Sequence, residues 1–239
     1  EQARISDLMR LTPFTGSSAL DIGARDGYLS RLLAERFDSV TALDLELPNI
    51  DHPRITCLKG DITALQLPDA SFDLVFCAEV LEHIPPPLLA TACRELARVC
   101  SKHVLVGVPY RQDIRLGRTT CVSCGGTNPP WGHVNSFDEH RLAALFPGFV
   151  ATAQSFVGTS AEATNAVSSW LMDLAGNPYG TYVQEEPCIH CNATLQAPPE
   201  RRLWQKVATR LAFIGMRIQK PFIKPHGNWI HLLLTRHPG

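Results

Sequence analysis

Two pairs of cysteines have the spacing of metal ligands. Each pair is a Cys-x-x-Cys segment followed by small or turn-forming residues, Cys121/Cys124 and Cys188/Cys191. Two thiolates on a tight turn make half of a closed tetrahedral zinc site, so the two pairs together supply its four soft ligands. Unpaired thiols or a redox pair fit the doubled motif less well, and His190 is a weaker substitute ligand. We therefore expect one structural zinc ion. The other four cysteines lie singly in apolar surroundings: Cys57, Cys77, Cys93 and Cys100.

A second group of side chains combines carboxylates with an imidazole. Glu79, Glu82 and His83 follow an apolar run, and offsets of three and four place all three on one face if the stretch is helical. Such a group suits either a hard metal ion or general-base catalysis. His133, just before the next expected helix, is a further candidate.

Glycines and acids mark the ends of successive expected strands. The segment Asp21-Ile-Gly23-Ala-Arg-Asp-Gly27 lies where a strand gives way to a helix, and glycine there lets a nucleotide-like ligand approach the backbone. Asp44 ends the second strand, where a carboxylate accepts hydrogen bonds from both hydroxyls of a ribose, and Asp61 follows the third strand. A turn without a ligand is the plain alternative. A nicotinamide dehydrogenase is disfavoured because its Gly-x-Gly-x-x-Gly spacing is absent.

An alternation of strands and helices positions these residues. Apolar runs of strand length occupy residues 18–22, 40–45, 54–58, 72–77 and 103–108, with later ones at 149–157 and 228–235. Helical spacing covers residues 28–37, 88–99, 138–145 and 161–174. This βαβ rhythm implies a parallel sheet with helices on both faces, and its carboxyl edge is where a ligand binds.

The ordered motifs resemble class I S-adenosylmethionine-dependent methyltransferases of the type 11 kind. The resemblance rests on Leu20-Asp-Ile-Gly-Ala-Arg-Asp-Gly27, Ala42-Leu-Asp44, Gly60-Asp-Ile62 and Phe72-Asp-Leu-Val-Phe-Cys-Ala-Glu-Val-Leu-Glu-His-Ile84. It implies an α/β, Rossmann-like fold with a mostly parallel seven-stranded sheet and helices on both faces. The cysteine pairs add a small zinc-ribbon-like insert.

The resemblance also implies a site for S-adenosylmethionine. It assigns seven contacts: Asp21, Gly23 and Gly27 at the amino acid end, Asp44 at the ribose, Asp61 and Ile62 at the adenine, and Cys77 beneath the sulfonium. One departure is Arg25, where the family often has glycine. Either the turn is wider here or the Arg25 side chain points outward.

Similarity to small-RNA ribose methyltransferases, and less to ubiquinone-pathway O-methyltransferases, gives the second group of side chains a role. It implies that Glu79, Glu82, His83 and His133 hold Mg²⁺, which would orient and acidify an acceptor hydroxyl. Without the ion, His133 or His83 would be the general base.

We expect the chain to consist of three segments. Residues 1–157 form a methyltransferase core with the insert 109–136, residues 158–199 a helix and the second zinc knuckle, and residues 200–239 a basic amphipathic helix and the last strand of the core sheet. The last segment holds eight basic side chains and one acidic one, against 14 and 22 in residues 1–199. A helix packed on the domain with a solvated basic side is the plain interpretation. An anionic contact, with lipid, a nucleotide-sugar diphosphate or RNA, is the alternative.

Composition and hydropathy argue against other classes of protein. The 239 residues are 45% hydrophobic and 19% charged, which argues against a disordered chain. No apolar run approaches the roughly 18 to 20 residues of a transmembrane helix. The first residues, Glu1-Gln-Ala-Arg-Ile5, lack the pattern of a signal peptide, so we expect a cytoplasmic protein.

These observations favour an enzyme that transfers a methyl group from S-adenosylmethionine to a hydroxyl of a small molecule, sugar or glycan intermediate. The glycan acceptor follows from the resemblance alone. Two alternatives stay open: a metal-dependent RNA ribose 2'-O-methyltransferase, with nucleic acid the less favoured partner, and a catalytically degenerate scaffold, which Arg25 supports.

Overall fold

The computed structural model describes residues 1–13, 15–198 and 200–237. Residues 199 and 238–239, which end two of the expected segments, lie outside this description. The chain divides into two units: unit 1 comprises residues 1–110, 137–158 and 227–239, and unit 2 comprises residues 111–136 and 159–226.

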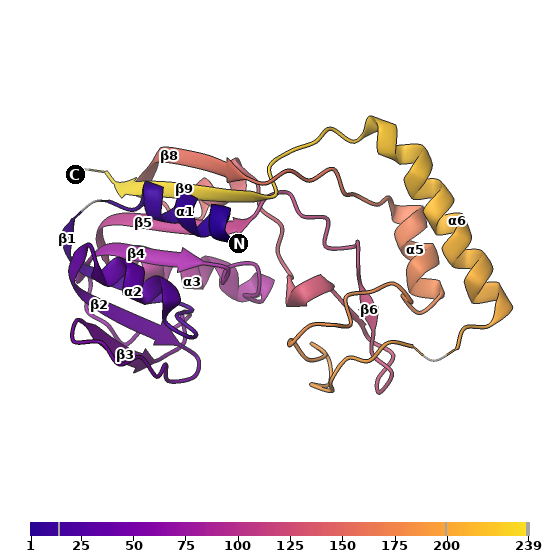
Figure 1. The fold of residues 1–239 in the computed structure, drawn as a ribbon, viewed down its shortest axis with the longest axis horizontal. Coiled ribbons are helices and arrows are strands. Elements are labelled where there is room, and N and C mark those ends of the chain that lie inside the picture. Colours follow the sequence, from indigo (N-terminus) through magenta and orange to yellow (C-terminus); the bar gives the residue numbers. More distant parts are fainter. Residues whose placement is uncertain (14, 199, 238–239) are drawn as a thin grey trace. The chain divides into compact units, whose positions relative to one another are not determined.

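Unit 1 is built on a seven-stranded sheet (Figure 1). Its strands are β1 (Gly16–Ile22), β2 (Phe37–Asp44), β3 (Ile55–Lys59), β4 (Phe72–Ala78), β5 (Cys100–Pro109), β8 (Phe149–Val157) and β9 (Trp229–Arg236). They are ordered β3-β2-β1-β4-β5-β9-β8. The first five are parallel, and β9 runs antiparallel to both β5 and β8. The expected α/β fold with a mostly parallel seven-stranded sheet is confirmed.

Helices cover both faces of this sheet. They are α1 (Gln2–Leu11), α2 (Tyr28–Ala34), α3 (Pro86–Val99) and α4 (Glu139–Ala144). Side chains of α1 and α2 pack with Leu74, Phe76 and Leu105, whereas α3 and α4 pack with the alternate residues Val75 and Cys77. Because successive side chains of a strand point to opposite faces, each central strand contributes to both cores.

Some element boundaries differ from those expected. The second helix ends at Ala34 rather than residue 37, because Phe37 already begins β2. The helix expected from residue 161 starts at Ala166, where the Asn165 side chain caps it by accepting a hydrogen bond from the Ser168 N–H. Helix α1 was not expected at all.

Unit 2 contains less regular structure. Its elements are the strands β6 (Thr119–Thr120) and β7 (Thr127–Asn128), a 3-10 turn at Pro130–Gly132, α5 (Ala166–Leu174), α6 (Leu203–Gln219) and a second 3-10 turn at Lys220–Phe222. Helices α5 and α6 pack side by side (Figure 1). Across residues 1–13, 15–198 and 200–237, every helix is too short or too polar to cross a membrane.

A buried polar cluster fixes α1 against the antiparallel part of the sheet. The Asp7 carboxylate bonds the Nδ1 of the fully buried His231 in β9 at 2.6 Å and accepts a hydrogen bond from the Ser155 hydroxyl in β8 at 2.9 Å. Burial opposes the charge of Asp7, but hydrogen bonds from Arg10, His231 and Ser155 outweigh it and hold the pKa of Asp7 below its usual value. Burial also lowers the pKa of His231.

We predict that Asp7→Asn lowers the free energy of unfolding by about 1–3 kcal/mol, because His231 loses a charged partner inside the protein. Urea unfolding near neutral pH measures this change. The matched control is Asp38→Asn, which changes an exposed aspartate of β2. Equal effects of the two substitutions would contradict the prediction.

Candidate active site and metal centre

The turn between β1 and α2 needs glycine at two positions. Gly23 and Gly27 both have φ of +77°, in the left-handed region that side chains disfavour. A Cβ atom on Gly23 would lie 2.5 Å from the Cγ2 of Val80, and one on Gly27 would collide with Ile50. The turn is also tied to β2, because the N–H groups of Gly23 and Ala24 both donate to the Leu43 carbonyl. Val80 and Ile50 therefore occupy the space that a side chain would need, so the turn requires glycine at both positions.

Arg25 lies in the same turn, between the two glycines. The residue adopts φ of +46°, the left-handed conformation that a glycine would take, and its side chain is exposed. Its N–H donates to the Oδ2 of Asp44 at 2.9 Å. Arg25 therefore adopts a conformation that the glycine of the family pattern favours, which weakens the argument for a degenerate site.

Asp44 ends β2 and is oriented by the backbone. Its Oδ1 accepts a hydrogen bond from the Leu45 N–H at 2.7 Å, and its Oδ2 accepts the one from Arg25. A carboxylate has about four lone-pair positions, so about two stay available. A side chain held in this way can accept two neighbouring hydroxyls.

Asp21 is a buried acid of this edge. It is 2% exposed, and its Oδ2 accepts a hydrogen bond from the Ser30 hydroxyl at 2.5 Å. Burial raises its pKa to about 7; the Ser30 bond acts against this shift, and the charge of Asp44 adds to it. Asp21 therefore carries a proton at mildly acidic pH.

The sheet brings most of the expected cofactor residues to one edge. Ile22 pairs with Leu43 and with Cys77, so the ends of β1, β2 and β4 are level. Cys77 is fully buried. After β3, Asp61 accepts hydrogen bonds from the N–H and hydroxyl of Thr63, which lower its pKa, and Ile62 is buried beside it. The cofactor roles of these residues stay predictions.

The turn after β4 is not helical. Glu79, Glu82 and His83 were expected to share one face only if this stretch formed a helix, so they do not share a helical face. Glu79 has φ of +58°, and the N–H of His83 donates to the Val80 carbonyl, so the chain passes through tight turns. Pro85 is extended, with ψ of 132°, because a residue that precedes proline is disfavoured in helical conformation, so this turn does not continue into the next helix. Helix α3 begins only at Pro86.

Arg4 of α1 contacts this turn and was missed in the sequence. The Arg4 guanidinium, which is buried, forms ion pairs with Glu79 and Glu1 and lies 4.7 Å from the centre of the Trp229 ring. The position of Arg4 in the sequence could have revealed this role, because Arg4 lies one helical turn before Leu8 on the apolar face of α1. Because Arg4 already neutralises Glu79, that carboxylate is a poor ligand for a cation.

Glu82 is a buried acid without a hydrogen-bond partner. It is fully buried, and within the part of the chain that the structure describes neither carboxylate oxygen has a partner. Burial raises its pKa to about 8, against a smaller opposing effect of Arg4. Carboxyl groups with a raised pKa are typical of sites that carry protons.

His133 belongs to unit 2, whereas Glu79, Glu82 and His83 belong to unit 1. Its Nδ1 lies 2.6 Å from the Oε1 of Gln112, which fixes the orientation of the ring. The Mg²⁺ site that would combine these four residues stays a prediction.

The four cysteines of the two pairs come together in unit 2. Their sulfur atoms all lie within 4.8 Å of one another. The Cys121 and Cys191 sulfurs are 3.7 Å apart, and so are those of Cys124 and Cys188. A tetrahedral zinc with bonds of about 2.3 Å requires sulfur separations of about 3.8 Å, so the four side chains fit this ion.

The two cysteine turns have the same backbone geometry. In each, the residue after the second cysteine is left-handed and its N–H donates to the carbonyl of the first cysteine, at 2.8 Å for both Gly125 and Asn192. The His190 ring instead lies 3.0 Å from the Thr127 carbonyl through its Nε2. His190 is therefore not needed as a ligand.

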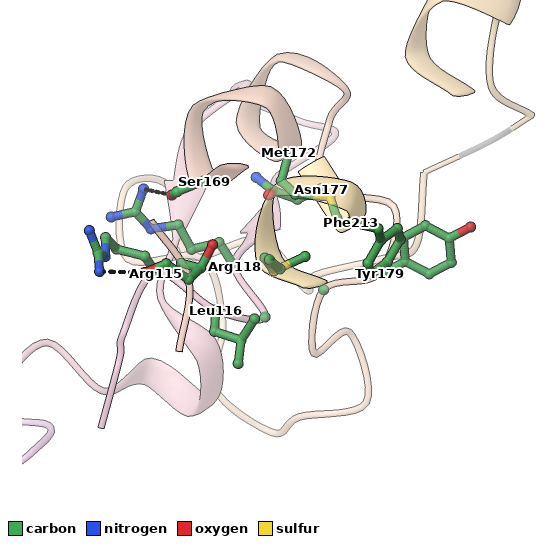
Figure 2. A pocket seen from close by; sticks show the side chains of 12 residues that line it. Arg115, Leu116, Arg118, Ser169, Met172, Asn177, Tyr179 and Phe213 are labelled. Atoms are coloured by element: carbon green, nitrogen blue, oxygen red, sulfur yellow. Dashed lines mark hydrogen bonds between the residues drawn. The ribbon is translucent and has the colours of Figure 1, made fainter. Parts of the chain in front are cut away.

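A cavity in unit 2 lies between α5, α6 and the segments 115–118 and 177–180 (Figure 2). Its two arginines are both engaged: Arg115 binds both oxygens of Asp113, and Arg118 pairs with Asp173. Its volume is about 90 Å³, well below the roughly 300 Å³ of a typical ligand pocket. This cavity does not suit a methyl acceptor.

Comparison with known proteins shows what the first part of unit 1 is similar to. Residues 20–106 match the sequence model of a family described as methyltransferase domain. A ubiquinone biosynthesis O-methyltransferase of Idiomarina loihiensis is 33% identical over 103 residues, 38% of this chain and 40% of that protein. A "Probable S-adenosylmethionine-dependent methyltransferase" of Mycobacterium tuberculosis is 32% identical over 152 residues, 60% of this chain and 53% of that protein. The chain thus spans about half the length of these relatives, or less.

Solved structures share the fold at low identity. The YcgJ protein of Bacillus subtilis is 14% identical, with a TM-score of 0.59 and full coverage of both chains. The 1,6-didemethyltoxoflavin-N1-methyltransferase of Burkholderia thailandensis, solved with S-adenosylhomocysteine, is 12% identical, with a TM-score of 0.55 over 100% of this chain and 80% of that one. The [4+2]-cyclase SpnF is 16% identical, with a TM-score of 0.56 over 98% and 80%. Since a cyclase is among them, these likenesses establish the fold alone.

We predict that Asp21→Asn becomes more stable relative to the unsubstituted protein as the pH rises from about 4 to about 7. In the unfolded chain Asp21 ionises near its usual value of 3.8, whereas burial keeps it protonated in the folded protein up to about 7. Its stabilising contribution is therefore present at low pH and is lost as the pH rises, by an amount on the order of a few kcal/mol. Thermal unfolding across this range measures the difference.

Asp61→Asn is the control, because the pKa of Asp61 is lowered and its contribution has the opposite pH dependence. A constant difference between Asp21→Asn and the unsubstituted protein would refute the assignment.

Proposed function

We propose that this protein methylates a hydroxyl oxygen of a small molecule, sugar or glycan intermediate, with S-adenosylmethionine as donor, because residues 20–106 match a family described as methyltransferase domain. The observation that carries the proposal is the alignment of Asp21, Asp44 and the glycine turn on the carboxyl edge of adjacent strands. The class of acceptor is supported by the ubiquinone biosynthesis O-methyltransferases, which align over about a third of the chain.

The residues at this edge fit the parts of the cofactor. The turn at Gly23 and Gly27 lies at the end of β1, where the amino acid end would bind. The available lone pairs of Asp44 suit the two ribose hydroxyls, and Asp61 and Ile62 suit the polar and apolar parts of the adenine. The fully buried Cys77 would form the wall beneath the reacting methyl group. S-adenosylmethionine supplies an activated methyl group on a sulfonium, so the protein must mainly position the acceptor and receive its proton.

The proton receiver that we favour is the imidazole of His83. Glu82, whose pKa is raised to about 8, is mostly protonated at neutral pH and cannot accept a proton there. His83 lies next to it in the same turn and is only half-buried. Imidazoles are the commonest general bases in enzymes. The pairing of Arg4 with Glu79 speaks against Glu79 as a ligand of a divalent ion.

We further propose that the four cysteines hold one structural zinc. The equal sulfur separations of 3.7 Å and the matching backbone turns support a closed site with no open position. In this role the ion would join the segments around Cys121 and Cys188, which are also linked by the hydrogen bond from the Ile189 N–H to Asn128 and by an apolar cluster that includes Leu195.

We predict that the purified chain binds S-adenosylhomocysteine and that Asp44→Ala weakens the affinity on the order of 10- to 100-fold, because two hydrogen bonds to a charged acceptor are lost. Isothermal titration calorimetry measures both affinities. Asp38→Ala, at the opposite end of β2, should leave the affinity unchanged.

Transfer itself is tested with radiolabelled S-adenosylmethionine and panels of sugars and phenols that carry free hydroxyls. Labelled O-methyl products whose formation requires His83 support the proposal. Absence of cofactor binding in the intact protein would instead favour the degenerate scaffold.

We predict one zinc per chain, measured by elemental analysis of the protein purified without added metal. Cys124→Ser should lose most of this zinc, because a structural site depends on all four thiolates. Removal of the ion should raise hydrogen exchange around residues 119–128 and 186–195, while the sheet of unit 1 stays protected. Cys57→Ser, a half-buried cysteine outside the cluster, is the matched control and should retain the zinc. Zinc at a level unaffected by Cys124→Ser would exclude this site.

A further inference from the structure

Helix α6 exposes an apolar stripe along its whole length. Five aliphatic side chains lie at helical spacing and are each at least 49% exposed: Leu203, Val207, Leu211, Ile214 and Ile218. On a helix of 3.6 residues per turn they lie within an arc of about 80°. Phe222, in the 3-10 turn that follows, is 82% exposed and continues the apolar character.

The opposite side of α6 is used for packing inside unit 2. Its buried residues are Ala208, Thr209 and Ala212, and the helix lies against α5. At Gly215 the helices approach so closely that a Cβ atom would lie 2.5 Å from the Ser168 hydroxyl oxygen. Since small residues already hold α6 against α5, the apolar stripe is not required for the folding of this pair.

Basic side chains run along one border of the stripe. Lys206, Arg210 and Arg217 fall on adjoining positions of the helix, and all three are exposed. Within the part of the chain that the structure describes, no ion pair engages any of them. Lys220 and Lys224 extend the basic border beyond the helix, and Glu200 is the one acid in residues 200–239.

We propose that α6 is a docking helix for a membrane surface rich in anionic lipid. The helix would lie in the plane of the interface, with its aliphatic stripe among the acyl chains and its basic border at the headgroups, as interfacial amphipathic helices do. The proposal goes beyond methyl transfer and does not depend on it.

Charge and shape favour this partner over two others. In a symmetric dimer the same surface meets itself, which would bring the basic border of one copy close to that of the other. Single-stranded RNA is usually bound on aromatic platforms; α6 also exposes Trp204 and Phe213, but its continuous stripe is aliphatic. An anionic membrane satisfies both the apolar stripe and the positive charge.

The test is sedimentation of the intact protein with vesicles. We expect binding to phosphatidylcholine vesicles that contain phosphatidylglycerol, little binding to phosphatidylcholine alone, and weakening by salt, which screens the charges. The double substitution Lys206→Gln with Arg210→Gln should weaken binding about fivefold for each basic side chain removed. Val207→Ser with Ile214→Ser should weaken it on the order of tenfold or more.

The matched control is Arg54→Gln with Arg94→Gln, which removes the same charge from exposed positions in unit 1 and should leave binding unchanged. Retained circular dichroism and zinc content show that each variant is folded. Equal binding to both kinds of vesicle, or equal loss in the control, would overturn the proposal. So would self-association in analytical ultracentrifugation, or RNA binding, that the Val207 and Ile214 substitutions abolish.

Discussion

The pairing of β1 with β2 on one side and β4 on the other is the constraint on which the candidate active site depends. The register sets Ile22 level with Leu43 and Cys77, so three strands end at the same height. Because all three are parallel, the residues that follow them meet at one edge although they are far apart in the sequence. A slip of one residue in either pairing would turn Asp21 or Asp44 to the opposite face of the sheet.

Several acidic residues lie at this edge, and their negative charges would repel one another if all of them were ionised. Asp21 and Glu82 are buried, and burial raises the pKa of each, to about 7 and about 8, so that near neutral pH both carry a proton for much of the time. Glu79 is neutralised by Arg4, which α1 brings to the same place. Asp44, which is not fully buried, retains backbone donors to both oxygens. The oriented carboxylates of the edge are thus those of Asp44 and of Asp61, which the N–H and hydroxyl of Thr63 hold.

The parts of the fold that were predictable are those with local patterns. The strands of the sheet were identifiable because apolar runs alternate with helical spacing, and the cysteine cluster because each Cys-x-x-Cys pair is a complete turn by itself. Helix α1 was missed because Arg4 interrupts its apolar face, and its anchor at Asp7 depends on His231, at the other end of the chain. The turn after β4 was ambiguous because offsets of three and four place residues on one face only if the backbone is helical, and three residues alone do not establish a helix. Contacts between residues distant in sequence leave no such local pattern.

The positions of basic side chains on α6 offer a physical explanation for the uneven charge distribution along the chain. The chain as a whole has a net charge of −1, which by itself gives no reason to expect an anionic partner. That value conceals a basic C-terminal segment, in which Lys206, Arg210 and Arg217 occupy one border of a single helix. An aliphatic stripe of this length on the surface costs solubility unless a partner covers it, and its packing against α5 already uses the opposite side. Charge on the border and apolar surface beside it are therefore more simply explained together, by one partner that is both apolar and anionic, than as two unrelated features.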